Sequence, residues 1–118
     1  MMQCYTPPVV NVMRTRARVI PVEHPYVVKP GETIAIPLYN GTLAPGSDWK
    51  NVLRYLGTVS IPARLCLRTE DGTFSSHRVA VFRVNAPAGL RAIVPVLLSG
   101  FRQTCVSCRT VHFLVYVK

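Results

Sequence analysis

Turn-forming residues are spread along the whole chain, and the segments between them alternate apolar with polar side chains. The 118 residues include 10 prolines and 7 glycines, which gather nowhere into a linker. Proline and glycine interrupt long regular elements, whereas alternation with a period of two is typical of half-buried β-strands. The pattern therefore predicts one domain of six to eight short strands.

The strand pattern is clearest in six segments: residues 14–19, 32–38, 57–68, 73–84, 90–98 and 110–118. The run at 90–98 is almost wholly apolar, which favours a strand buried on both faces. Lys29, Pro30 and Gly31 predict a turn, and Asp71-Gly72 predicts a tight hairpin between two neighbouring strands. Pro37 and Pro95 interrupt the pattern and indicate a sheet edge or a bulge.

One segment, residues 47–56, favours a short helix. Trp49, Val52, Leu53 and Leu56 recur at helical spacing there, and Ser47 is a suitable residue to cap the first turn. We expect Trp49 to be a core or lid residue rather than a platform for a ligand.

These elements predict an all-β fold, an antiparallel two-sheet sandwich with one short helix near residues 47–56. The strand pattern leaves open whether the sandwich is a jelly roll or immunoglobulin-like, and the long connection over 40–56 slightly favours the jelly roll. We expect residues 1–13 to be an extended N-terminal arm and residues 14–118 to form a single domain.

The charge of the chain is strongly positive and carried mainly by arginine. Fourteen Lys and Arg against five Asp and Glu give a formal net charge of +9, and 11 of the cations are Arg. Asp71 is the last acidic residue, so from Gly72 onward the charged side chains are all basic. This balance predicts a polyanion or an acidic protein surface as the partner.

The alternation places the arginines in two rows. Arg14, Arg16 and Arg18 are spaced to share one face of a strand, and Arg64 and Arg68 form a second, sparser row. We expect these five residues to contact a partner, and the pattern leaves open whether the partner supplies phosphate groups or acidic side chains.

Four cysteines are present, and two of them form a Cys-x-x-Cys pair, Cys105 and Cys108. A structural zinc site needs four ligands, and the sequence shows no second pair of this kind. We therefore expect a protein without a cofactor, and a zinc site at Cys105 and Cys108 is the alternative. Cys66 alternates with Arg64 and Arg68, which indicates a small residue on the outer face or an interface thiol.

No catalytic signature occurs in the chain, so we expect a protein that is not an enzyme. High apolar content and few charges favour a structural or assembly protein that binds a repeating protein surface or forms a homo-oligomer. Small viral capsid, cement and capsid-decoration proteins are of this kind, an analogy at the level of fold alone. The alternative is a nucleic-acid-binding module, stabilised by zinc in one version.

The first residues carry neither a basic segment nor an apolar stretch of the kind found in secretory signals. The longest purely apolar run covers residues 92–98, too short to cross a bilayer. We therefore expect no signal peptide and no membrane partner, and a location in a virion or in the cytoplasm.

Overall fold

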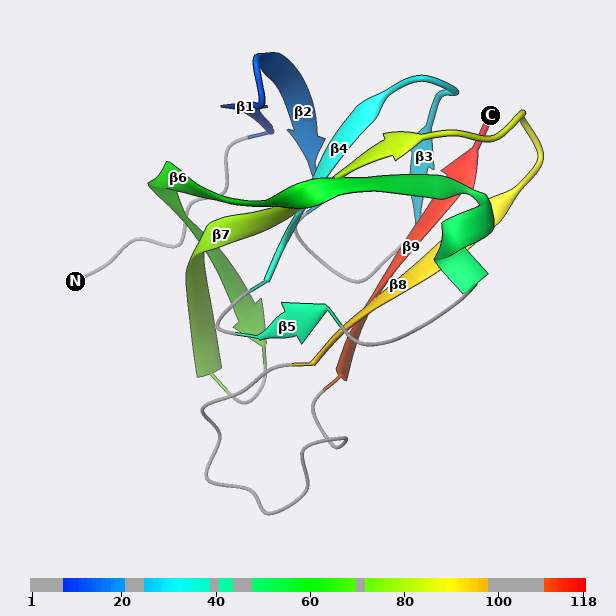
Figure 1. Ribbon diagram of the computed structural model, residues 1–118. Helices are drawn as coiled ribbons and strands as arrows, with labels where there is room; N and C mark the ends of the chain where they lie inside the picture. Colours follow the sequence, from blue (N-terminus) through cyan, green and yellow to red (C-terminus); the bar gives the residue numbers. More distant parts are fainter. Residues whose placement is uncertain (1–7, 21–24, 39–40, 44–47, 70–71, 98–109) are drawn as a thin grey trace.

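The computed structural model describes residues 8–20, 25–38, 41–43, 48–69, 72–97 and 110–118. Within these ranges the fold is nearly all β, and its strands form two sheets (Figure 1). The five-stranded sheet has the order β1 (Val9–Val12), β2 (Thr15–Val19), β4 (Thr33–Pro37), β7 (Gly72–Val84), β6 (Leu53–Thr69). The four-stranded sheet has the order β3 (Tyr26–Val28), β9 (Thr110–Val117), β8 (Arg91–Leu97), β5 (Thr42–Leu43).

Both sheets are mixed, which corrects the prediction of purely antiparallel pairing. β2 runs parallel to β4, and β3 runs parallel to β9, while the other pairs are antiparallel. The cause is that the chain leaves the five-stranded sheet after β2 and contributes β3 to the other sheet. It then returns as β4 beside β2, and a crossover of this kind makes the two neighbours parallel.

β4 lies at the centre of the five-stranded sheet, and all five of its residues are buried. Ile34 pairs with Phe82 and faces the four-stranded sheet, whereas Ala35 pairs with Val81 on the opposite side. That opposite side is covered because the five-stranded sheet is curled into a half-barrel, which brings β1 near β6. The sequence predicts that one face of this strand is buried, and the curl of the sheet buries the other face as well.

Pro37 fits into this central strand because β2 pairs only with Ile34 and Ala35. At the position of Pro37 the single paired neighbour of β4 is Val79 of β7. A proline can occupy a strand where the side of its missing N–H has no partner strand, so the prediction of a local edge is confirmed there.

β6 and β7 form a long antiparallel hairpin that bends sharply along its length (Figure 1). Its register shifts between Tyr55 and Gly57 and again between Ser60 and Leu65, a stretch that contains Pro62. The predicted hairpin is confirmed by the pairing of Thr69 with Gly72, although the connecting residues 70–71 lie outside the described ranges.

The predicted helix over 47–56 is wrong for most of its length. A single 3-10 turn, η1 (Asp48–Asn51), is present, and Leu53 already pairs with Val84 as the first residue of β6. Helical spacing was outweighed by strand pairing, because this pairing buries Leu53 against the core. Trp49 is only 6% exposed, which confirms it as a core residue.

Residues 9–12, expected in an extended N-terminal arm, are extended but belong to the five-stranded sheet as β1. Val10 and Val12 are buried there and join a hydrophobic cluster that spans both sheets. The division of the chain into arm and domain otherwise stays a prediction. Within the described ranges, the structure contains no helix long and apolar enough to cross a bilayer.

Candidate functional site

The β1–β2 hairpin carries the first of the two predicted arginine rows, but it divides that row. Val12 pairs with Thr15, so the two residues between them, Met13 and Arg14, form the turn. Both have positive φ, 50° and 61°, as a type I′ turn requires. Arg14 is therefore a turn residue, and only Arg16 and Arg18 share the face of β2.

Arg18 is held within the fold. Its guanidinium donates a hydrogen bond to the carbonyl oxygen of Val27 in β3, and its Nε lies 3.4 Å from Oε2 of Glu32. Oε1 of Glu32 accepts a hydrogen bond of 3.0 Å from the amide of Lys29, in the turn predicted at Lys29, Pro30 and Gly31. Arg18 thus links β2 to the four-stranded sheet.

Arg14 and Arg16 are exposed and line an open hollow of about 560 Å³ together with Asn11 and Thr15. Asn11 pairs with Arg16 across the hairpin, so their side chains lie on the same face. Among the described residues, none of these four side chains has a hydrogen-bond or ion-pair partner. The hairpin therefore offers guanidinium, amide and hydroxyl donors together, a set suited to the oxygens of an anion.

The second row, Arg64 and Arg68, lies on β6, but the structure describes the backbone of these residues and not their side chains. Their role as contact residues stays a prediction.

Cys66, between those arginines, is buried at 8% exposure and disulfide-bonded, which corrects the expectation of a small residue on the outer face or an interface thiol. A sulfur in a disulfide is not available as a thiolate ligand, so Cys66 does not complete a zinc site with Cys105 and Cys108. That Cys-x-x-Cys pair lies outside the described residues, and the side chains that are described include no group of three or more metal-ligating residues.

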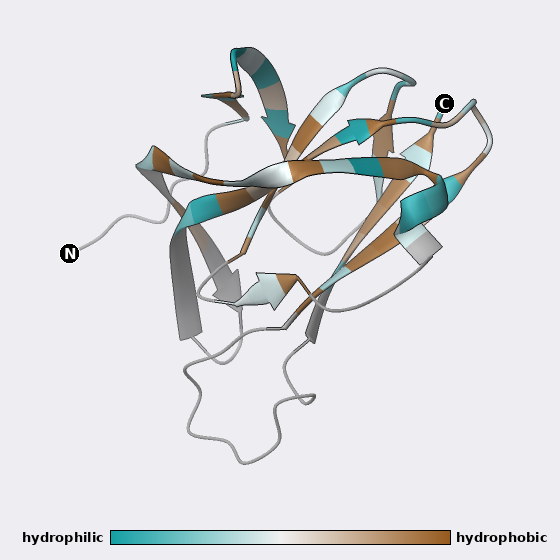
Figure 2. Cartoon of the chain, viewed as in Figure 1, coloured by the Kyte–Doolittle hydropathy of each residue, from teal (hydrophilic) through white to brown (hydrophobic). Residues whose placement is uncertain are grey.

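One side of the four-stranded sheet carries apolar side chains that no described strand covers. We call it the outer face and define it by Val27, Ile93, Leu114 and Tyr116. Val27 pairs with Tyr116, and Ile93 pairs with Leu114, so the four residues lie on one side of the sheet. Val27 is 48% exposed and Ile93 is 42% exposed, while Leu114 and Tyr116 are partly buried. Figure 2 shows long hydrophobic stretches along β8 and β9.

The outer face corrects the prediction that residues 90–98 form a strand buried on both faces. In β8 the residues Ala92, Val94 and Val96 are buried, but Ile93 between them is not. A run of consecutive apolar residues contains no alternation, so the sequence could not show that one face lacks a cover. Its apolar composition was nevertheless the signal that pointed to this surface.

Comparisons of the chain with protein-family models, with curated proteins and with solved structures found no match.

Proposed function

We propose that the protein is a non-enzymatic assembly protein that docks its outer face on a repeating protein surface, as a small viral capsid, cement or capsid-decoration protein does. The observation that carries the proposal is the exposure of Ile93 in a strand whose composition is that of a buried one. Exposed apolar side chains gathered on one sheet face are typical of surfaces that a partner covers.

Charge indicates what kind of surface the partner presents. Arg91 is exposed on the outer face, directly across from Tyr116, and Lys118 is exposed at the end of β9. No carboxylate belongs to this face among the described side chains. The complementary surface is therefore apolar at its centre and acidic at its rim, which matches the general anatomy of protein interfaces and the +9 charge of the chain.

We further propose that the two sheets pack as a sandwich with a jelly-roll or immunoglobulin-like strand order. The five-stranded sheet would then support the outer face rigidly from behind. A location in a virion or in the cytoplasm belongs to the same proposal.

The test is co-sedimentation of the purified protein with particles from its source, together with native mass spectrometry to detect homo-oligomers. Ile93→Glu places a charge at the centre of the outer face and is expected to abolish particle binding or self-association. Ser60→Glu is the matched control, because it adds the same charge at an exposed position on β6 of the other sheet. A monomer that binds no particle, or an Ile93→Glu variant that binds as well as the wild type, would overturn the proposal.

A second candidate function is nucleic-acid binding through the β1–β2 hairpin, supported by the unpartnered donors of Asn11, Arg14 and Arg16. Retention on immobilised single- or double-stranded nucleic acid should fall steeply with salt, since each phosphate contact releases counterions. Arg14→Ala with Arg16→Ala should weaken retention, whereas Arg18→Ala, which removes an internally held guanidinium, should change it less. The zinc-stabilised version of this candidate rests on Cys105 and Cys108 and predicts bound metal in native mass spectrometry.

A further inference from the structure

Two arginines lie directly opposite each other on neighbouring strands of the five-stranded sheet. Arg54 of β6 pairs with Arg83 of β7 in the antiparallel register, and both side chains are exposed. Side chains at directly opposed positions project from the same face, with β-carbons about 4.5–5.5 Å apart. The two arginine side chains therefore start from adjacent positions on one face of the sheet, although their residues are far apart in the sequence.

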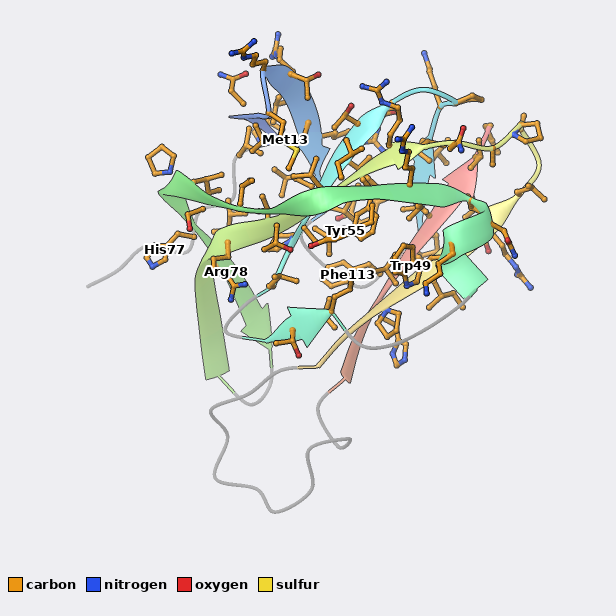
Figure 3. The ribbon with its side chains drawn as sticks, viewed as in Figure 1. Met13, Trp49, Tyr55, His77, Arg78 and Phe113 are labelled. Carbon is orange, nitrogen blue, oxygen red and sulfur yellow. The ribbon has the colours of Figure 1, made fainter. Side chains whose placement is uncertain are left out.

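The neighbouring pair in the register shows which face this is. Tyr55 pairs with Phe82, their ring centroids lie 5.5 Å apart, and Phe82 also contacts Trp49 on the side of the four-stranded sheet. Since side chains alternate along a strand, Arg54 and Arg83 point to the opposite side. Figure 3 shows Met13 on that opposite side of β6 from Tyr55.

Nothing in the described structure neutralises this pair of charges. Neither arginine makes an ion pair or a hydrogen bond with a described residue, and Glu32, the one carboxylate whose side chain is described, is engaged with Arg18. On the other side of Arg83 the register places Thr33, whose side chain brings a hydroxyl to the same face. Like charges directly opposite each other destabilise a sheet, so the pair is a cost to the fold unless an anion binds between them.

We propose that Arg54 and Arg83 form a clamp that binds one phosphate group. Each guanidinium presents a planar fork of N–H donors, and two such forks match the oxygens and the charge of a phosphate better than the single planar edge of a carboxylate. The phosphate belongs either to a small ligand or to a nucleic-acid backbone. The clamp is independent of the outer face and of the β1–β2 hairpin, because it uses none of their residues.

The test compares thermal unfolding in chloride with unfolding in inorganic phosphate at constant ionic strength. Arg54→Gln and Arg83→Gln each remove the repulsion, so each variant should melt higher than the wild type in chloride. Phosphate should raise the melting temperature of the wild type by clearly more than that of either variant, since loss of one fork weakens binding by roughly tenfold or more.

Arg91→Gln is the matched control, since it removes an exposed arginine of the other sheet and leaves the pair intact. It should keep the phosphate-dependent rise. The clamp is ruled out if Arg54→Gln and Arg83→Gln keep that rise, or if Arg91→Gln loses as much of it. With the clamp supported, a single-stranded oligonucleotide that competes with phosphate identifies a nucleic-acid backbone as the source, and a lack of competition identifies a small phosphorylated ligand.

Discussion

A β-carbon added to Gly57 would lie 3.0 Å from Cε of Met13, so the turn of the β1–β2 hairpin closes directly onto β6. Gly57 lies at a register shift of the long hairpin. Its φ of +138° is a backbone conformation that residues other than glycine rarely adopt. The close approach of Met13 to Gly57 therefore brings the turn after the first strand of the curled sheet against its last strand.

Gly57→Ala should lower the free energy of unfolding by about 1–3 kcal/mol, through backbone strain and the clash with Met13. Chemical denaturation measures the loss. Gly89→Ala is the control for strain alone, because Gly89 also has positive φ (+104°) but nothing lies within 4 Å of an added β-carbon. In a Met13→Ala background the cost of Gly57→Ala should shrink, and an unchanged cost would show that the contact is unimportant.

Trp49 is buried with its Nε1 lacking a hydrogen-bond partner in the described structure, and its ring lies 5.2 Å from that of Phe82 in an edge-on arrangement. Trp49→Phe removes the unpaired N–H while keeping an aromatic ring, so stability should change by less than about 1 kcal/mol. Trp49→Ala should cost about 3–5 kcal/mol. Equal losses for the two variants in urea denaturation would contradict this account of the site.

Arg14 adopts a left-handed backbone conformation with φ of 61°, which costs a non-glycine residue about 1–2 kcal/mol. Arg14→Gly should therefore raise the melting temperature while it weakens retention on nucleic acid. Arg14→Ala separates the two effects, since it removes the charge but keeps the strain. If both substitutions alter stability equally, the strain at this position is negligible.

The ion pair of Arg18 with Glu32 should contribute only about 0.2–1 kcal/mol, because the Arg18 side chain is 40% exposed. A double-mutant cycle with Arg18→Gln and Glu32→Gln measures the coupling, which should decline as salt is added. A coupling that does not respond to salt would show that the hydrogen bond to Val27 dominates instead.

The disulfide at Cys66 should be visible as resistance of this cysteine to alkylation until a reductant is added. Cys66→Ser should lower the free energy of unfolding by about 2–5 kcal/mol in oxidising buffer. In reducing buffer the wild type should lose most of this advantage. Alkylation of Cys66 in the unreduced, denatured protein would contradict the disulfide.

Alternation in the sequence was enough to predict β9 almost to the residue, because Phe113, Val115 and Val117 are separated by polar or partly exposed positions. Helical spacing, not alternation, led to the expectation that Trp49 belongs to the core, which its burial confirms. Alternation failed over residues 52–56, where apolar spacing fits a helix and a strand equally and only pairing with Val84 decides.

The surfaces were harder to predict than the strands. The predicted arginine row at 14–18 required all of these residues to lie in one strand. Arg14 instead lies in a turn with Met13, and the positive φ angles of this turn cannot be deduced from residue spacing. The juxtaposition of Arg54 with Arg83 depends on the register of a hairpin with two irregularities. Pairing of this kind is decided by tertiary packing and has no signature in the local sequence.

The place of β9 between β3 and β8 governs the order in which the fold can be completed. Tyr26 pairs with Val115, so the partner of a strand near the beginning of the chain emerges from the ribosome only after about ninety further residues. Until then β3 and β8 have open backbone edges, and the side chains Ala92 and Val94 lack their neighbours Val115 and Phe113. A chain stalled or truncated before residue 110 thus exposes sheet edges prone to aggregation, and β3 joins the four-stranded sheet only when β9 arrives.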